Sequence, residues 1–305
     1  MLKESFLSFL RFERNYSEKT VRSYGIDLEK FEEYLKGVDE ELDFTGVDAD
    51  LVRGWVLRLM EQGYATTSVN RKLSSLRSFY QYLLRKRVIE KDPMATVKGP
   101  KNKKPLPVFV RDEEMSRLLD EQEWKTGLEG LRNRLIVEMF YVTGMRLSEL
   151  INLKDGDVDF SAQVMKVTGK RNKQRLIPFG EELKGDMNAY LDLRDKEISG
   201  SPEAFFVRKD GKSLYPRMVY LLVRQSLSKV VTLKKKSPHV LRHTFATSML
   251  NNGAELSAVK ELLGHESLTT TEVYTHTTFE ELKKVYKQAH PRAVSYTHLT
   301  LPTIL

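Results

Sequence analysis

One short stretch, about a third of the way along the chain, does most to limit what this sequence can fold into. Residues 98–107 read Lys-Gly-Pro-Lys-Asn-Lys-Lys-Pro-Leu-Pro, with three prolines and four lysines. Proline fixes φ and lacks a backbone N–H, so neither a helix nor a central strand is expected to run through this stretch. The sequence therefore predicts two domains, residues 1–97 and 108–293, joined by a basic linker. A chain of 305 residues is long enough for both to bury their own cores.

The first domain is predicted to be helical throughout. Ser17 is a typical N-cap for a helix that ends at Gly37, and a second helix is expected from Ala49 to Gln62. The clearest helical pattern begins at Thr66, where apolar side chains recur every three or four residues. These side chains are Val69, Leu73, Leu76, Tyr80 and Leu83.

The other face of this third helix is basic. No acid lies between Thr66 and Arg87, whereas a solvated helix face usually mixes charges of both signs. Clustered cations release counterions from a phosphate backbone, which favours a helix that lies along DNA. The alternative for this helix is an ordinary soluble surface helix. For the linker at residues 98–107, the alternative is a merely flexible hinge. The predicted DNA contacts are Arg71, Lys72 and Arg77 on the helix and Lys101 and Lys103 in the linker.

The second domain is predicted to be mainly helical with a small antiparallel sheet. An apolar helix covers Leu131 to Val142 and stops at Gly144. The last helix is expected at about Phe279 to Gln288. The β-prone runs are residues 157–160, 163–168 and 174–178, separated by turn residues, with 204–207 as a further strand. The fold class is thus mainly α in two domains, the second of them mixed α/β.

Composition excludes several classes of protein. The net charge of +8 favours a polyanionic partner, and no apolar run approaches the length of a membrane span. The N-terminus does not resemble a secretory signal, and the lack of cysteine excludes disulfides and thiolate metal sites. We therefore expect a cytoplasmic protein. Residues 294–305 contain no acid, lysine or arginine and are interpreted as a non-native tail.

The residues that can carry chemistry gather late in the chain. Residues 237–247 read Ser-Pro-His-Val-Leu-Arg-His-Thr-Phe-Ala-Thr, so a Ser-Pro pair starts a helix that places His239, Arg242 and His243 within one turn. An arginine can hold anionic oxygens, and imidazoles can move protons. Of the two histidines, His243 is the one we expect to be a core hydrogen-bond donor. This set is suited to a phosphodiester substrate.

His265 and Tyr274 follow in the same part of the chain. Gly264 permits a tight turn before His265, and the Tyr274 hydroxyl is a candidate nucleophile. A second arginine, Arg146, comes after a helix-ending glycine, where the next helix begins. Glu149, one turn further on, could simply pair with it.

A basic hairpin supplies the candidate acid. Lys170 lies in the predicted turn between the second and third strands, together with Arg171, Lys173 and Arg175. A lysine on a hairpin tip is often only a solvated charge, but these four cations could reach into a groove of DNA. Arg171 and Lys173 are therefore added to the predicted DNA contacts.

These residues together resemble the active site of the tyrosine recombinases, and most closely that of the Xer-type enzymes. The strings TGMRLSEL, TGKRNKQRLIP, SPHVLRHTFAT and LLGHESLTTTEVYTH, with the closing HPRA, carry the resemblance, which spans residues 1–293. The resemblance implies that Tyr274 attacks a DNA phosphate to give a 3′-phosphotyrosine, and that Lys170 protonates the departing 5′-oxygen. It implies no metal, ATP or other cofactor. The matching residues are Arg146, Lys170, His239, Arg242, His265 and Tyr274.

By the same resemblance, Arg146 and Arg242 stabilise the charge on the phosphate, while the sequence does not divide proton transfer between His239 and His265. The implied partners are a double-stranded recombination site, a homo- or hetero-tetramer on two duplexes, and a paired recombinase or activating protein. The last helix is expected to pack on a neighbouring protomer.

Several related functions compete with Xer-like resolution of chromosome or plasmid dimers. An integrase or transposase of a mobile element is the main alternative, and the sequence leaves the choice open. A type IB topoisomerase-like enzyme is disfavoured by the compact helical first domain and by the string LLGHESLTTTEVYTH. A catalytically idle DNA-binding protein is disfavoured because all six residues are present.

Overall fold

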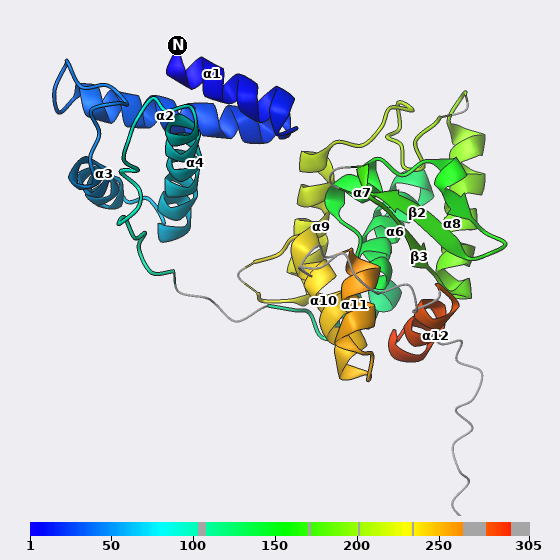
Figure 1. Ribbon diagram of the computed structural model, residues 1–305. Coiled ribbons are helices and arrows are strands. Elements are labelled where there is room, and N and C mark those ends of the chain that lie inside the picture. The colour runs from blue at the N-terminus through cyan, green and yellow to red at the C-terminus, as the bar shows by residue number, and fades with distance from the viewer. Residues whose placement is uncertain (103–107, 170–171, 201, 234, 265–278, 294–305) are drawn as a thin grey trace, which may run out of the picture. The chain divides into compact units, whose positions relative to one another are not determined.

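The computed structural model describes residues 1–102, 108–169, 172–200, 202–233, 235–264 and 279–293. The chain divides into two compact units, Met1–Pro105 and Leu106–Leu305, and each contains its own hydrophobic core (Figure 1). A mainly helical fold with one small antiparallel sheet confirms the predicted fold class.

The first unit is a small helical bundle. Its helices are α1 (Leu2–Ser8), which continues as a π-helical turn over Phe9–Glu13, α2 (Glu18–Lys36), α3 (Ala49–Glu61) and α4 (Thr66–Arg85). The prediction of helix throughout residues 1–97 was too broad, because residues 86–102 form turns and contain no helix.

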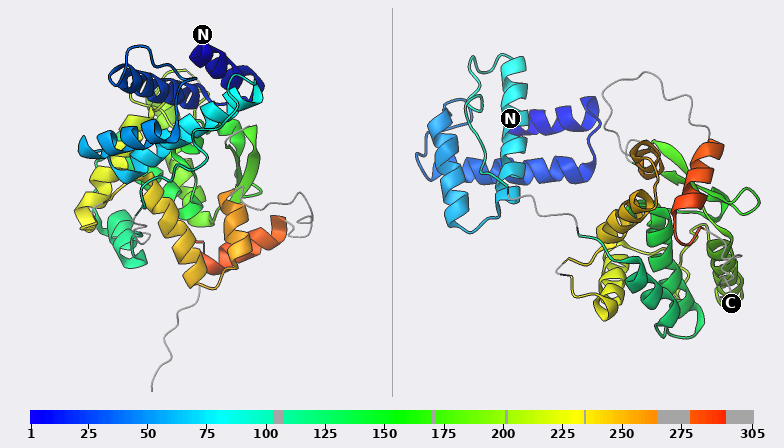
Figure 2. Two further views of the ribbon diagram at one scale, coloured as in Figure 1. Left: turned by 60° about the vertical axis from the view of Figure 1, so that its left-hand side comes forward. Right: turned by 90° about the horizontal axis from the view of Figure 1, so that it is seen from below.

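Capping and aromatic packing explain this bundle. Ser17 caps α2 as predicted, with its Oγ accepting a hydrogen bond from the Thr20 N–H at 3.3 Å. Helices α1 and α2 lie side by side and α4 crosses α2 (Figures 1 and 2). In the core, the Phe31 and Trp55 rings meet edge to face with their centroids 4.9 Å apart, so the bundle is held by large aromatic side chains.

The second unit combines helices with a three-stranded antiparallel sheet. Strands β1 (Val158–Asp159), β2 (Val164–Thr168) and β3 (Gln174–Pro178) lie in the order β1–β2–β3, with Met165 opposite Ile177. The short α5 (Asp112–Ser116) is followed by a π-helical turn over Arg117–Glu121. A 3₁₀ turn at Asp155–Asp157 precedes β1. The remaining helices are α6 (Gly127–Thr143), α7 (Leu147–Ile151), α8 (Glu181–Glu197), α9 (Pro216–Val230), α10 (Pro238–Asn251), α11 (Leu256–Leu263) and α12 (Phe279–Ala289).

Helix α6 is the centre of this unit. Its residues are buried from Leu135 to Thr143 without interruption, so no face of this part of the helix points to solvent. It packs against α8, α9 and α10 (Figure 1). The C-terminal end of α6 is therefore fixed from several sides, and the next turn of the chain starts from a rigid support.

One expectation about this unit was wrong. Residues 204–207 form no strand, since Ala204 and Val207 each make only an isolated bridge, with Lys154 and Ser213 respectively. Helix α12 packs against α10, α11 and β3 of its own chain (Figure 1), and its packing on a neighbouring protomer stays a prediction. Its buried Leu282, Tyr286 and Ala289 belong to the core of the second unit.

No helix among the described residues is both long enough and apolar enough to span a membrane. Nor do these residues contain a group of three or more histidine, aspartate or glutamate side chains placed to hold a metal ion.

Candidate active site

Arg146 is positioned by a glycine turn. Helix α6 ends at Gly144, whose φ of +59° is left-handed, as predicted for a helix-ending glycine. A Cβ at Gly144 would lie 2.5 Å from the Phe245 ring and 2.8 Å from the Leu263 side chain, so a larger residue does not fit there without movement. Arg146 follows as the N-cap of α7. It is half-buried, and its backbone is extended.

Glu149 is a buried carboxylate shared by two arginines. Its oxygens accept the Arg146 backbone N–H at 2.7 Å and the Arg146 Nη1 at 2.8 Å. They also accept Nη1 and Nη2 of Arg175, from β3, at 2.7 and 2.9 Å. Burial alone would raise the pKa of Glu149, but the hydrogen bonds and charges of Arg175 and Arg146 lower this pKa to about 2. The carboxylate is therefore ionised at neutral pH.

Arg242 lies on the inward face of α10. It is only 8% exposed, and it donates to the carbonyl oxygens of Gly144 and Leu263, both at 2.6 Å. Burial, and then the nearby charges of Arg146 and Arg175, lower the pKa of Arg242 to about 10. It is still a cation at neutral pH, and its interaction with an anion is screened less by water than at an exposed site.

The C-terminal end of α11 gathers all three arginines. The Leu262 carbonyl accepts from Arg175 Nε at 2.8 Å, the Leu263 carbonyl from Arg242 Nη2 at 2.6 Å, and the Gly264 carbonyl from Arg146 Nη2 at 2.9 Å. These carbonyls end a helix, where cations are favoured by the helix dipole. We call Arg146, Arg175 and Arg242, with Glu149, the arginine cluster. It brings together residues that are far apart in sequence.

His239 and His243 both lie on the exposed surface of α10. The helix starts with Ser237 as N-cap and Pro238 at its first position, as predicted. The expectation that His243 is a core hydrogen-bond donor was wrong. Successive helix residues are rotated by about 100°, so His243 turns away from the inward face that Arg242 occupies.

A hollow of about 590 Å³ lies beside His239. The side chains around it include the cations of Arg224, Lys235 and Lys236 and the ring of Tyr220. An anion that reached His239 would thus meet several positive charges.

Four predicted site residues, Lys170, Arg171, His265 and Tyr274, lie outside the described residues, as does Lys103. Their described neighbours nevertheless border the arginine cluster. Gly169, just before Lys170, is bonded through its N–H to the Lys173 carbonyl at 2.8 Å, and a Cβ on it would lie 3.3 Å from Glu149 Oε1. The carbonyl oxygen of Gly264, just before His265, accepts a hydrogen bond from Arg146.

The predicted DNA contacts in the first unit differ in exposure. Arg77 is half-buried and donates to the Val97 carbonyl at 3.2 Å, whereas Lys101 is exposed, as is Lys173 in the second unit. Lys72 is 3% exposed, with its Nζ 2.8 Å from Asp27 Oδ1. This corrects the expectation that Lys72 lies on the basic solvent face, because a buried acid from α2 attracts it inward.

Asp27 also holds Arg71, which stays half-exposed and donates two hydrogen bonds to the Asp27 carboxylate at 2.6 and 2.7 Å. A hollow of about 400 Å³ opens beside this pair. Its lining includes Lys19, Arg22 and Lys30 as well as Arg71. The basic surface of the first unit therefore comes from α2 as much as from α4.

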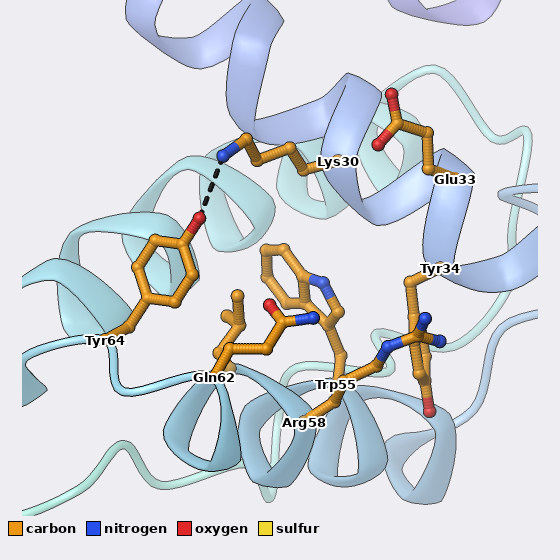
Figure 3. Close-up of a pocket in the computed structure, with 8 residues that line it drawn as sticks. Lys30, Glu33, Tyr34, Trp55, Arg58, Gln62 and Tyr64 are labelled. Atoms are coloured by element: carbon orange, nitrogen blue, oxygen red, sulfur yellow. Dashed lines mark hydrogen bonds between the residues drawn. The ribbon is translucent and has the colours of Figure 1, made fainter.

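A smaller hollow of about 170 Å³ lies between α2 and α3 of the same unit (Figure 3). Lys30 Nζ donates to Tyr64 Oη at 2.9 Å, and the Arg58 guanidinium lies 5.7 Å from the centre of the Tyr34 ring (Figure 3). Lys30 and Tyr64 border both hollows. Aromatic neighbours thus hold these surface cations in place.

Sequence reasoning missed Arg175 and understated Glu149. Arg175 was grouped with the solvent-facing cations of the hairpin, but it shares a face of β3 with buried Ile177. The period of two along a strand could have shown this. For Glu149, the spacing of three residues from Arg146 is that at which a glutamate accepts the backbone N–H of the N-cap residue, and the structure contains this hydrogen bond.

Two family models match successive parts of the chain. The model of the family described as "Phage integrase family" matches residues 109–281, and that described as "Phage integrase, N-terminal SAM-like domain" matches residues 4–87. Tyrosine recombinase XerC of Chlorobaculum tepidum is 40% identical to this chain, covering 94% of each. The XerC of Staphylococcus saprophyticus is 39% identical, covering 96% of this chain and 98% of its own.

Among solved structures, the XerH site-specific recombinase bound to its difH substrate, in a pre-cleavage complex, has a similar fold. The TM-score is 0.68 at 22% identity, covering 92% of this chain and 83% of that one. At this identity the likeness concerns the fold.

Proposed function

The chain belongs to the phage integrase family of tyrosine recombinases, and from this premise we propose that it is a site-specific DNA recombinase of the Xer type. It cuts a DNA strand through a 3′-phosphotyrosine and joins the strand to a second duplex, which resolves dimers of a chromosome or plasmid. The observation that carries this proposal is the meeting of Arg146 and Arg242 on consecutive carbonyls, Gly264 and Leu263, directly before His265.

Arg146 and Arg242 have N–H donors with which they bind a phosphate. Each guanidinium has more N–H donors than its contacts in the arginine cluster use. The remaining donors of Arg146 and Arg242 bind the non-bridging oxygens, whose charge grows as a nucleophile adds to phosphorus. Donors fixed before the reaction stabilise that charge without reorganising.

Tyr274 is the proposed nucleophile. Its oxygen forms a bond to phosphorus as the bond to the 5′-oxygen breaks, and Lys170 gives that oxygen a proton. His239 and His265 bind the phosphate or accept the tyrosine proton. A 5′-hydroxyl from another strand then reverses the step and releases Tyr274. One phosphodiester is exchanged for another, so the reaction needs no nucleotide triphosphate.

Basic residues in both units hold the duplex. In the first unit these are the cations of the hollow beside Asp27, together with Arg77, Lys101 and Lys103. In the second they are Arg171 and Lys173 of the β2–β3 connection. Recombination joins two duplexes, so a homo- or hetero-tetramer is the proposed assembly, with a paired recombinase or an activating protein as further partners. We place its action at DNA in the bacterial cytoplasm.

A plasmid assay tests the proposal. A target site is first selected from random duplexes by binding to the full chain, and two direct copies are then placed on one supercoiled plasmid. The wild-type protein is expected to convert this plasmid into two smaller circles, while Tyr274→Phe binds the site and gives no product. Tyr215→Phe, an exposed tyrosine outside the site, is the matched control and should recombine normally.

The same assay separates recombination from relaxation. A topoisomerase would relax the supercoiled plasmid whether or not the two sites were present, and would leave its length unchanged. Relaxation without smaller circles would overturn the proposed function.

A further inference from the structure

Arg175 is the member of the arginine cluster to which the proposed reaction assigns no task. Its side chain is 13% exposed, against 27% for that of Arg146. All three of its side-chain nitrogens are engaged, two with Glu149 and one with the Leu262 carbonyl. Three of its five N–H donors are thus bound to described residues, against two for Arg146 and two for Arg242, so its contacts are mainly with other parts of the fold.

Arg175 connects three elements that each carry part of the proposed site. It stands on β3, at the base of the hairpin that bears Lys170. Through Glu149 it reaches α7, where Arg146 begins the helix, and through Leu262 it reaches the end of α11 that leads into His265. These elements are distant in sequence, so a side chain that contacts all of them sets their spacing.

Close packing around Arg175 leaves these positions little freedom. Gly264 adopts a left-handed φ of +64°, and a Cβ at this position would lie 3.0 Å from Arg175 Cδ. A Cβ on Gly169 would lie 3.3 Å from Glu149 Oε1, the oxygen that also accepts Arg175 Nη1. The hairpin, Glu149 and the turn before His265 are therefore in contact around one guanidinium.

Charge in the cluster also depends on Arg175. One buried carboxylate faces Arg146 and Arg175 directly, and Arg242 lies close enough for its charge to be felt. Because Arg175 takes both oxygens of Glu149, the carboxylate is shared, and Arg146 is only partly neutralised. Without Arg175, Glu149 would lose two of the hydrogen bonds that fix it and would hold Arg146 less firmly in place.

We propose that Arg175 is a positioning residue that fixes Glu149 and the turn before His265, so that Arg146 is presented to the scissile phosphate in register with the Lys170 hairpin. This rests on the proposed function, because it assigns Arg146 to the phosphate. Lysine cannot replace arginine fully at this place. A single ammonium cannot reach two carboxylate oxygens and a carbonyl in the plane that the guanidinium spans.

Cleavage kinetics on a nicked duplex, which traps the covalent product, test the proposal in Arg175→Gln and Arg175→Lys. We expect Arg175→Gln to slow cleavage of bound DNA by about a hundredfold, the usual effect of a small misplacement, with an unchanged Kd. Arg175→Lys should recover part of the rate. Lys166→Gln removes an exposed cation from the neighbouring strand β2 and is the control that should cleave normally.

The pH profile gives a second readout. Arg175 helps to lower the pKa of Glu149, so its removal should raise this pKa and move the acidic limb of the rate profile to higher pH. Arg146 and Arg242 are the other charges that face Glu149 in the described structure, and both stay in the variant. A simple loss of packing would lower the rate without moving this limb.

Hydrogen exchange of the backbone at residues 262–264, measured without DNA, keeps the two proposals apart. Faster exchange in Arg175→Gln than in the wild type supports the positioning role even if the wild type fails to cleave, a result that would count against the proposed function alone. Unchanged exchange with a wild-type cleavage rate and pH profile would overturn the role of Arg175. So would a weaker Kd with normal cleavage of bound DNA, because Arg175 would then be a DNA contact.

Discussion

Single residues set the geometry of the arginine cluster, and Gly144 is the most constrained of them. It combines a left-handed φ with a Cα that faces the Phe245 ring and the Leu263 side chain at close range. Those two side chains come from α10 and α11, which supply Arg242 and the carbonyl end that receives it. A side chain at Gly144 would push apart the elements that bring Arg146 and Arg242 together.

Gly144→Ala should therefore lower the free energy of unfolding by about 2–4 kcal/mol, from backbone strain and overpacking. Urea denaturation followed by circular dichroism measures the loss. The control is Gly185→Ala in α8, where a Cβ would meet nothing within 4 Å. That change should stabilise the protein by about 0.5–1 kcal/mol, because alanine favours a helix. Equal stability of the two variants would contradict this account of Gly144.

In the first unit, Asp27 is the single residue that holds a cluster of charged side chains together. Burial would raise its pKa, but hydrogen bonds from Arg71, Lys72 and Ser75 outweigh this and leave the pKa lowered. Asp27→Leu should cost about 3–5 kcal/mol, because it leaves the Lys72 ammonium buried without a partner. Adding Lys72→Leu should recover most of the loss. Equilibrium unfolding of the single and double variants checks this, and a double variant no better than Asp27→Leu would count against it.

At the scale of elements, the carbonyl end of α11 and the C-terminal α12 each hold together parts of the second unit that are distant in sequence. The first gathers the arginines. The second is anchored by His290, which is fully buried and stacks on Phe245 and Tyr286. His290 Nε2 lies 3.2 Å from the Tyr141 carbonyl, and Nδ1 accepts the Arg292 N–H at 3.2 Å. Both contacts are satisfied only by a neutral imidazole with its proton on Nε2.

This anchor should make the protein less stable in mild acid. Burial, followed by the charge of Arg292, lowers the pKa of His290 to about 3. In the unfolded chain the pKa of a histidine is about 6.5, so the folded protein, which keeps His290 neutral, has its full stability above this pH. This stability is lost as the pH falls from about 6.5 toward 3. Between pH 7 and pH 5 the loss should be about 2 kcal/mol.

Urea unfolding at the two pH values measures this loss. His290→Gln keeps a donor and an acceptor but does not titrate, so its stability should change less over the same range. An identical pH dependence in the wild type and His290→Gln would show that His290 is not the source.

How far the sequence predicts these elements depends on whether the signal is local. The Ser17 cap, the glycine end of α6 and strands β2 and β3 follow from short-range patterns, and the structure confirms them. Lys72 and Arg175 were misjudged because their partners, Asp27 and Leu262, lie far away in the chain. No local pattern shows a buried acid approaching from another helix.

At the scale of the whole molecule, the chain consists of two units that each possess a complete core. Residues 1–105 made alone should therefore unfold cooperatively, with a single transition by circular dichroism. They should also bind duplex DNA with an affinity that falls as salt rises, since the basic hollow beside Asp27 lies within this unit. A fragment that is unfolded at neutral pH would contradict the independent folding of this unit. A fragment that binds DNA independently of salt would contradict binding through its basic surface.

The central proposal is that this chain breaks DNA by forming a bond from Tyr274 to a 3′-phosphate. The most direct measurement is mass spectrometry of the peptides left on a nicked duplex after digestion of the trapped complex. We predict one DNA-bearing peptide, modified at Tyr274, with the DNA attached through its 3′ end and a free 5′-hydroxyl on the released strand. A covalent bond at another residue, attachment through a 5′ end, or cleavage with no covalent product would contradict the account.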